Sequence, residues 1–402
     1  MRKAHLIVAL ALALWLCGAV ASAQGGAIVV VENSHQGRFG QEIVFRLVVE
    51  SDSAIQRVAL YRQLDGEKVR VRAELSFSPG RRVEAEHIWE MEPGELRPGV
   101  NISYWWLVQD AAGRSLDVPP MSFVYADDRF EWQGLSDGLI RLWYYGRESR
   151  RAQEILAAAV EAAERIEGHI GISLEKPVAI YVYESRSDML PALAQRDQTY
   201  DERTVTLGLS TGGDTLLLLG SHADVLQTTA HEMSHIIVGA STENPYTDLP
   251  RWLDEGLAMY AEGALPSDNA KALDRAIRRD ELISVRSLSA YVGDASLVDL
   301  YYGEAYSLIA FMLDTYGQEK VAELLDVLED GTLPEDALNR VYGFGLDELD
   351  NQWRASLGLG PRSAEPADEP ARAARDGWPA CSATAWLPLA LVMGAACFRR
   401  RR

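Results

Sequence analysis

The chain has 402 residues, of which 48% are hydrophobic and 24% charged, so it is long enough for two ordinary domains that each bury a core. Its 39 Lys and Arg residues stand against 59 Asp and Glu residues, which gives a formal net charge of −20. Because such an acidic chain repels a phosphate backbone, nucleic acid is not expected as a partner. A solvated acidic surface is the simplest interpretation of the charge.

Residues 1–23 have the organisation of a secretory signal peptide. Arg2 and Lys3 precede the apolar run LIVALALALWLCGAV, and the small residues ASA follow it. Cys17 fits a lipoprotein cleavage site poorly, so we expect the segment to be removed, with an uncleaved membrane anchor as the alternative. The rest of the chain is therefore expected outside the cytoplasm.

Residues 27–125 consist of short segments in which apolar and polar residues alternate. IVFRLVVES, IQRVALYRQL and ISYWWLVQD are examples, and turns such as SPGR and AAGR separate such segments. This pattern predicts an all-β sandwich of immunoglobulin-like type. Trp105 and Trp106 are expected at core and face positions, with ligand stacking as the less favoured alternative. The segment DDRFEWQGLSDG is interpreted as a link to the next domain.

Residues 130–357 have a mixed pattern that predicts an α+β domain. RESRRAQEILAAAVEAAERIEGHIG predicts an amphipathic helix, KPVAIYVYES a buried strand, and residues 188–195 a short helix. TVTLGLSTGGDTLLLLG predicts a hairpin that turns at Gly212 and Gly213. Its second strand, over 215–219, is a candidate for pairing with an extended substrate. The remainder of the domain is predicted to be mainly helical.

The C-terminal end predicts a membrane attachment. Residues 358–380 are rich in Pro, Ala and charge and predict a disordered stalk. Residues 381–398 are apolar and form a short transmembrane candidate, and the arginines of 399–402 would stay cytoplasmic. A Cys, an apolar span and an Arg cluster also resemble bacterial sorting signals that are cut and replaced by an anchor, and the two alternatives stay open. Either way, the body is expected to be tethered to the cell membrane at the bacterial surface. Both cysteines that follow the signal lie in this tail, so the body is expected to contain no disulfide.

The segment TTAHEMSHIIV, over 228–238, contains His231-Glu232-x-x-His235. Two imidazoles one helical turn apart can share a tetrahedral Zn²⁺ ion, and the adjacent carboxylate of Glu232 can reach the water bound to it. A helix that carries two histidines and no metal is the alternative. At about 100° per residue, the histidines lie nearly opposite an apolar stripe. The stripe comprises Leu226, Ala230, Met233 and Ile237, and Ser221 with Asp224 is expected to form a capping box at the helix start.

A carboxylate is expected as the third ligand, because no histidine follows His235 and the cysteines lie outside the body. The segment DLPRWLDEGLAMYAEG supplies one, since Pro250 and Gly263 bracket a predicted helix that contains Glu255. Apolar neighbours surround Glu255, which disfavours a solvated helix charge. Asp254 is the nearest alternative.

HEMSH followed by PRWLDEGLA resembles the gluzincin metallopeptidases, in particular the bacterial peptidase MA-like family. The similarity extends over roughly residues 132–357 and leaves the β-sandwich outside. It implies a gluzincin-like domain with a small sheet and mostly helices. It further implies a zinc ion held by His231, His235 and Glu255, with Glu232 as the general base.

The resemblance also covers YYGEAYSLIAFMLDTYG, which is similar to a helix of aminopeptidase-type gluzincins. In those enzymes a tyrosine of this helix stabilises the oxyanion, and Tyr302, with Ala305 and Gly317, fits that frame. Tyr301 or Tyr306 could replace it, and an ordinary packed aromatic is equally compatible with the pattern.

Two departures from the family shape the functional hypothesis. Thermolysin-like enzymes have an Asp four residues after the glutamate ligand, where this chain has Met259, and the Gly-Ala-Met-Glu-Asn box of aminopeptidases is absent. The sequence therefore predicts a membrane-tethered zinc endopeptidase that acts on a peptide or protein substrate. The alternatives are a surface binding protein with an inactive peptidase-like domain and a zinc hydrolase of non-peptide substrates.

Overall fold

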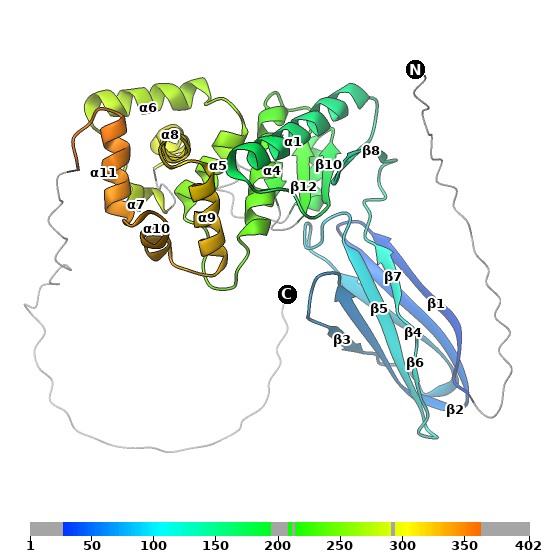
Figure 1. The fold of residues 1–402 in the computed structure, drawn as a ribbon. Helices are drawn as coiled ribbons and strands as arrows, with labels where there is room; N and C mark the ends of the chain where they lie inside the picture. The colour runs from blue at the N-terminus through cyan, green and yellow to red at the C-terminus, as the bar shows by residue number, and fades with distance from the viewer. Residues whose placement is uncertain (1–26, 194–207, 211–213, 291–293, 363–402) are drawn as a thin grey trace, which may run out of the picture. The chain divides into compact units, whose positions relative to one another are not determined.

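The computed structural model describes residues 27–193, 208–210, 214–290 and 294–362 (Figure 1). The predicted signal segment, the transmembrane or sorting segment, the arginine tail and most of the stalk lie outside these ranges, as does the turn at Gly212 and Gly213. Within the described ranges, no helix is both long and apolar enough to cross a membrane.

The N-terminal region is an antiparallel β structure, which agrees with the alternation in its sequence. Seven strands belong to one hydrogen-bonded sheet because β2 is long and pairs with different strands along its two halves. Its first half pairs with β1 and β4, and its second half pairs with β3 and β5. The strands are β1 (Val29–Arg38), β2 (Glu42–Leu64), β3 (Val71–Glu74), β4 (Gly80–Glu90), β5 (Asn101–Asp110), β6 (Ser115–Asp117) and β7 (Met121–Val124).

The alternation along β5 explains its tryptophans. Trp106 is fully buried, and its indole N–H donates a 3.0 Å hydrogen bond to Asn33 Oδ1. Trp105 is partly buried on the other side of the strand and stacks on Tyr61, with ring centroids 5.5 Å apart. The two tryptophans thus take the core and face positions that the sequence predicts.

A second sheet of five strands has the order β11-β12-β10-β9-β8. Its three central strands, β9, β10 and β12, are parallel, and β8 and β11 are antiparallel at the two ends. The run VAIYVY of β10 is buried on both faces, as expected for a central parallel strand. The strands are β8 (Gln133–Asp137), β9 (Ile140–Tyr144), β10 (Val178–Tyr183), β11 (Gly208–Ser210) and β12 (Thr215–Leu219).

The chain after β12 is helical within the described ranges, as predicted. Figure 1 shows α1 and α4 beside β10 and β12, and their apolar residues share one core with that face of the sheet. The helices before the site are α1 (Ser149–Ile170), α2 (Arg186–Met189) and the short η1 (Leu190–Ala192). Those that follow are α4 (Val225–Ser241), α5 (Arg251–Ala261), α6 (Ser267–Arg279), α7 (Val285–Leu288), η2 (Ala295–Leu297), α8 (Val298–Tyr316), α9 (Gln318–Glu329), α10 (Pro334–Tyr342) and α11 (Leu346–Ser356).

Gly256 lies at a close contact between α5 and α8. A Cβ atom at this position would lie 2.5 Å from the side chain of Ile309 and 2.6 Å from the carbonyl oxygen of Ala305. No larger residue fits at this position. The ligand candidate Glu255 and the contact with α8 at Gly256 are therefore neighbours in the sequence. This packing brings the tyrosines of α8 to the site.

Three local predictions were wrong. The expected linker contains β8, which forms a hairpin with β9. The expected capping box is absent, because α4 begins after Asp224 and has no side-chain cap. The strand over 215–219, the candidate for pairing with a substrate, is already paired on both sides, because β12 lies between β10 and β11.

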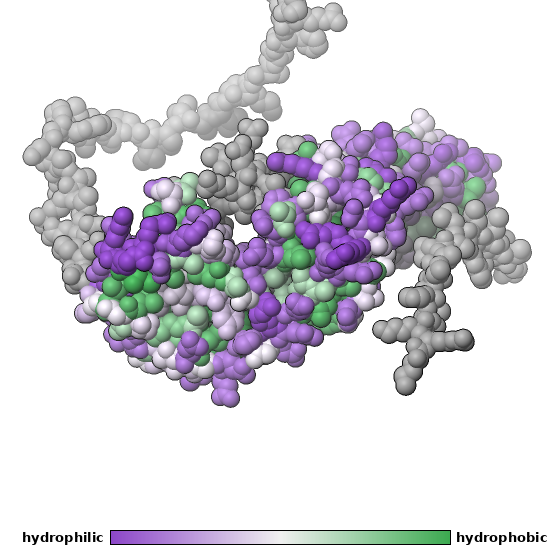
Figure 2. All heavy atoms as spheres, turned by 90° about the horizontal axis from the view of Figure 1, so that it is seen from above, coloured by the Kyte–Doolittle hydropathy of each residue, from purple (hydrophilic) through white to green (hydrophobic). Residues whose placement is uncertain are grey.

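Polar side chains dominate the visible surface. Figure 2 shows hydrophilic residues over much of the molecule's upper face, with apolar residues confined to smaller patches. This distribution agrees with the solvated surface that the acidic composition predicts.

Candidate active site

The structure brings His231 and His235 of α4 together with Glu255 of α5. The Nε2 atoms of the two histidines are 3.2 Å apart, and Oε2 of Glu255 lies 3.5 and 3.7 Å from them. A tetrahedral zinc ion with bonds of about 2.0–2.1 Å separates its ligand atoms by about 3.3 Å. The three atoms therefore have the spacing that a zinc ion requires, and this set alone forms a metal-sized cluster within the part of the chain that the structure describes.

Oε2 of Glu255 provides a second test of the fit. This atom is buried, and the histidine Nε2 atoms lie 3.5 and 3.7 Å from it, at or beyond the limit of an ordinary hydrogen bond. A buried carboxylate oxygen without a close partner is costly, and a bound cation would satisfy it. The other oxygen, Oε1, accepts a 2.6 Å hydrogen bond from Arg251. The residues present thus fit a zinc ion.

A further carboxylate contacts the Nδ1 atom of each histidine. Nδ1 of His231 is 2.9 Å from Glu262 Oε1, and Nδ1 of His235 is 2.8 Å from Asp254 Oδ1. In a neutral ring, Nδ1–H then donates to the carboxylate and leaves the Nε2 lone pair directed at the shared point. Asp254, considered from sequence as an alternative ligand, contacts a ligand candidate instead.

The carboxylates around the two histidines favour a positive charge in the site. Burial lowers the pKa of His231, but Glu255 and Glu262 outweigh this effect and raise the pKa to about 10. Burial raises the pKa of Glu255, but the two histidines and Arg251 bring it down to about 2. Without a metal, the surrounding carboxylates therefore favour the protonated form of His231.

Two of these supporting residues, Arg251 and Glu262, were not predicted from the sequence. Arg251 precedes Glu255 by four positions, and Glu262 follows it by seven, which is two helical turns. All three therefore project from the same side of α5. The helical spacing of Arg251, Glu255 and Glu262 was visible in the segment RWLDEGLAMYAEG. Met259, four residues after Glu255, is buried, and the contact to His231 comes from Glu262.

The predicted catalytic side chains lie beside the cluster. Glu232 is partly buried on α4, next to His231. The ring of Tyr302 is also partly buried, and its centroid is 6.2 Å from that of His231. Tyr301 is buried and donates a 3.2 Å hydrogen bond to the carbonyl of Leu288, whereas the Tyr306 ring lies 6.0 Å from that of Tyr260. Of the three tyrosines, Tyr302 has the ring contact with a ligand candidate, and its role in the reaction stays a prediction.

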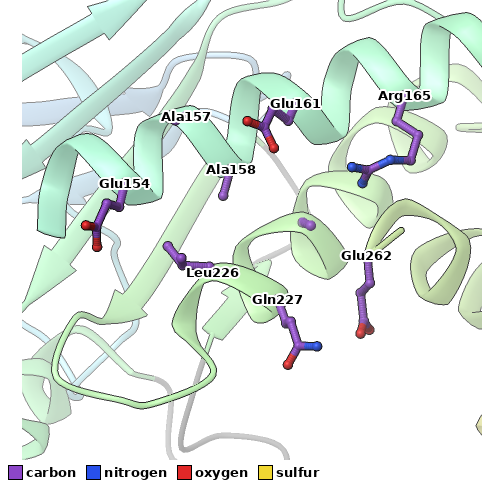
Figure 3. A pocket seen from close by; sticks show the side chains of 9 residues that line it. Glu154, Ala157, Ala158, Glu161, Arg165, Leu226, Gln227 and Glu262 are labelled. Carbon is purple, nitrogen blue, oxygen red and sulfur yellow. The ribbon is translucent and has the colours of Figure 1, made fainter. Parts of the chain in front are cut away.

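A cavity of about 320 Å³ lies between α1 and α4 (Figure 3). It adjoins the cluster through Glu262 and through Gln227, one turn before His231. Its wall contains more carboxylates than guanidinium groups, and Figure 3 shows Glu154 and Arg165 projecting from opposite ends of the α1 segment. The lining residues are Glu154, Ala157, Ala158, Glu161, Arg165, Leu226, Gln227, Ala230 and Glu262.

The family model described as the Peptidase MA superfamily matches residues 158–358, which include α4, α5 and α8. The chain belongs to the peptidase MA superfamily. The gluzincin resemblance identified from the two motifs is thereby confirmed, and the observed mixed α+β fold agrees with it. No curated protein matches the chain.

Solved structures with distant similarity include an M1 zinc metallopeptidase from Deinococcus radiodurans, 14% identical over 82% of this chain and 92% of that chain, with a TM-score of 0.37. A mutant of that enzyme bound to a Tyr-Ser-Ala substrate is 15% identical over the same shares, also with a TM-score of 0.37. A carbohydrate-binding module of family 56 is 14% identical over 24% of this chain and 98% of that chain, with a TM-score of 0.17. At such low TM-scores these similarities carry no argument about substrate.

Proposed function

We propose that this peptidase-superfamily member is a zinc metallopeptidase whose site lies between α4 and α5. The observation that carries the proposal is the buried Oε2 of Glu255, which lies 3.5 and 3.7 Å from the Nε2 atoms of His231 and His235. Two imidazoles and one carboxylate are a donor set that catalytic zinc sites use, with a further position left for water or substrate. The family membership supports hydrolysis of a peptide bond.

In the proposed reaction, His231, His235 and Glu255 would hold a zinc ion, which would supply a water of lowered pKa and polarise the scissile carbonyl. Glu232 takes a proton from the attacking water and delivers it to the leaving amine, so it acts first as a base and then as an acid. The Tyr302 hydroxyl donates a hydrogen bond to the oxyanion that forms at the carbonyl. Glu262 and Asp254 keep the imidazoles oriented throughout.

The substrate is proposed to be an extended peptide cut at an internal bond. The chain lacks the aminopeptidase box that would hold a free amino terminus, which favours an endopeptidase. Since β12 is paired on both sides, we propose instead that an added peptide strand pairs with β11, which among the described strands is the end of the sheet that contacts α4. This moves the predicted substrate strand by one position in the sheet.

The peptidase is further proposed to act outside the cytoplasm, tethered to the membrane. This rests on the sequence patterns of residues 1–23 and 381–398 alone. Cell fractionation tests it: the expected result is full-length mature protein in the membrane fraction, accessible to external protease. Recovery of the protein in the soluble cytoplasmic fraction would contradict it.

The decisive comparison for the activity uses four proteins: the wild type, Glu232→Gln, His231→Ala, and Glu164→Gln as a control at an exposed position of α1. We expect the wild type and the control to bind one zinc per chain and to cleave casein or quenched peptides. Glu232→Gln should keep its zinc and lose cleavage, and His231→Ala should lose both. Full activity in Glu232→Gln would refute the mechanism. A zinc-loaded wild type inert on broad peptide libraries would point to a non-peptide substrate.

A further inference from the structure

Arg251 is placed to determine how Glu255 can bind a metal. It stands one helical turn before Glu255 on α5, and its guanidinium donates a 2.6 Å hydrogen bond to Oε1. The carboxylate is almost fully buried, with 6% of its side chain exposed. The opposite oxygen, Oε2, is the one that faces both histidines. The two oxygens of one carboxylate thus have different surroundings.

We propose that Arg251 is a positioning residue that restricts Glu255 to metal binding through Oε2 alone. The inference rests on the proposed function of the site as a zinc centre. A charge-assisted hydrogen bond from a guanidinium is strong and directional, so it holds Oε1 away from the metal point. A carboxylate free of this restraint can turn and bind zinc through both oxygens, which would occupy the position needed by water or substrate.

Arg251 is itself supported by Tyr301. The Tyr301 hydroxyl hydrogen-bonds with the Arg251 side chain and donates to the backbone carbonyl of Leu288 at 3.2 Å. A relay thus runs from the chain at Leu288 through Tyr301 and Arg251 to Oε1 of Glu255. Because Tyr301 is buried, this relay is fixed by packing. Tyr301, considered from sequence as an oxyanion donor, belongs to the support of the ligand.

The test compares wild type with Arg251→Gln, which removes the charge and keeps an amide donor. Arg278→Gln is the matched control, because Arg278 pairs with Asp274 at the same helical spacing but on the exposed surface of α6. Zinc affinity is measured by chelator competition, and the coordination number by the intensity of the visible bands of the cobalt-substituted protein. We expect Arg251→Gln to weaken zinc binding about 10- to 100-fold and to reduce the cobalt band intensity, as added coordination does. The control should match the wild type in both.

Two further variants keep the test decisive if Arg251→Gln fails to fold. Tyr301→Phe removes the hydroxyl of the relay and should shift the cobalt spectrum in the same direction by a smaller amount. Arg251→Lys keeps the charge without the planar fork and should restore part of the zinc affinity. Cobalt spectra and zinc affinities equal to those of wild type in every folded variant would overturn the inference while leaving the peptidase proposal intact. A wild type that binds neither zinc nor cobalt would overturn both.

Discussion

The outer faces of the N-terminal strands and the α4–α5 pair both carry many charged side chains, but in contrasting ways. On the strands, opposite charges pair across the surface, as in Arg57 with Glu74, whose side chains are 37% and 48% exposed. Between α4 and α5, the carboxylates of Glu255 and Glu262 are 6% and 8% exposed and converge on two imidazoles. Exposed pairs contribute little to stability, whereas buried, convergent charges are costly and mark sites of function.

The largest effect is expected from a substitution at the centre of the buried cluster between α4 and α5. Glu255→Ala removes the ligand that bridges the two helices, so we expect zinc content near zero and peptidase activity at background. Metal analysis and peptide cleavage on the same purified sample check this. Because the histidines stay in place, zinc binding equal to wild type would show that Glu255 is not a ligand.

The next effect concerns Tyr302. Tyr302→Phe removes one hydroxyl and keeps the ring against His231. Loss of one oxyanion donor lowers kcat about 10²- to 10³-fold. Steady-state kinetics should show this decrease with little change in KM and with full zinc content. The same substitution at Tyr306 should leave kcat unchanged, and equal effects at both positions would argue against an oxyanion role.

A smaller effect is expected when the second carboxylate behind His231 is altered. Glu262→Gln keeps the shape of the side chain and weakens the contact to Nδ1, which is 2.9 Å long in the wild type. Loss of such an orienting carboxylate weakens metal affinity about 10- to 100-fold. Chelator competition measures the change, with Glu164→Gln as the control. An unchanged affinity would contradict the orienting role of Glu262.

The charge of the metal-free site predicts a pH dependence of stability. The pKa of His231 is raised to about 10 in the folded, metal-free protein, above its unfolded value of about 6.5. Its contribution to the free energy of unfolding is therefore complete below about 6.5 and is lost as the pH rises through about 10. Urea unfolding of chelator-treated protein across this window checks the slope. Glu262→Gln should flatten it, and an equal slope in the variant would contradict the assignment.

The smallest effect is expected on the exposed surface of the N-terminal strands. Arg57→Ala breaks an exposed pair, with the guanidinium 2.6 Å from Glu74, and should change the free energy of unfolding by about 1 kcal/mol or less. Zinc content and activity should equal those of the wild type. Urea unfolding measures the change. A loss of several kcal/mol would show that this exposed ion pair stabilises the protein as strongly as a buried one.

The sequence predicted the parts of this site that depend on local periodicity. The spacing of His231 and His235, the helix that ends before Gly263, and the alternation of β5 all follow from a single element. The sequence could not assign the outer partners, because the contacts of Glu262 and Asp254 depend on how α5 packs across α4. The relay of Tyr301 likewise depends on the close approach of α5 and α8 at Gly256. The missed strand β8 has an exposed pattern with few apolar residues, so its periodicity gave no signal.

The most direct test of a zinc peptidase between α4 and α5 is a zinc titration of the metal-free wild type, with peptide cleavage measured at each step. We predict no cleavage without metal and a rise in activity that is linear in added zinc and stops at one equivalent per chain. Full cleavage by the zinc-free protein, or one tightly bound zinc with no gain in cleavage, would contradict it.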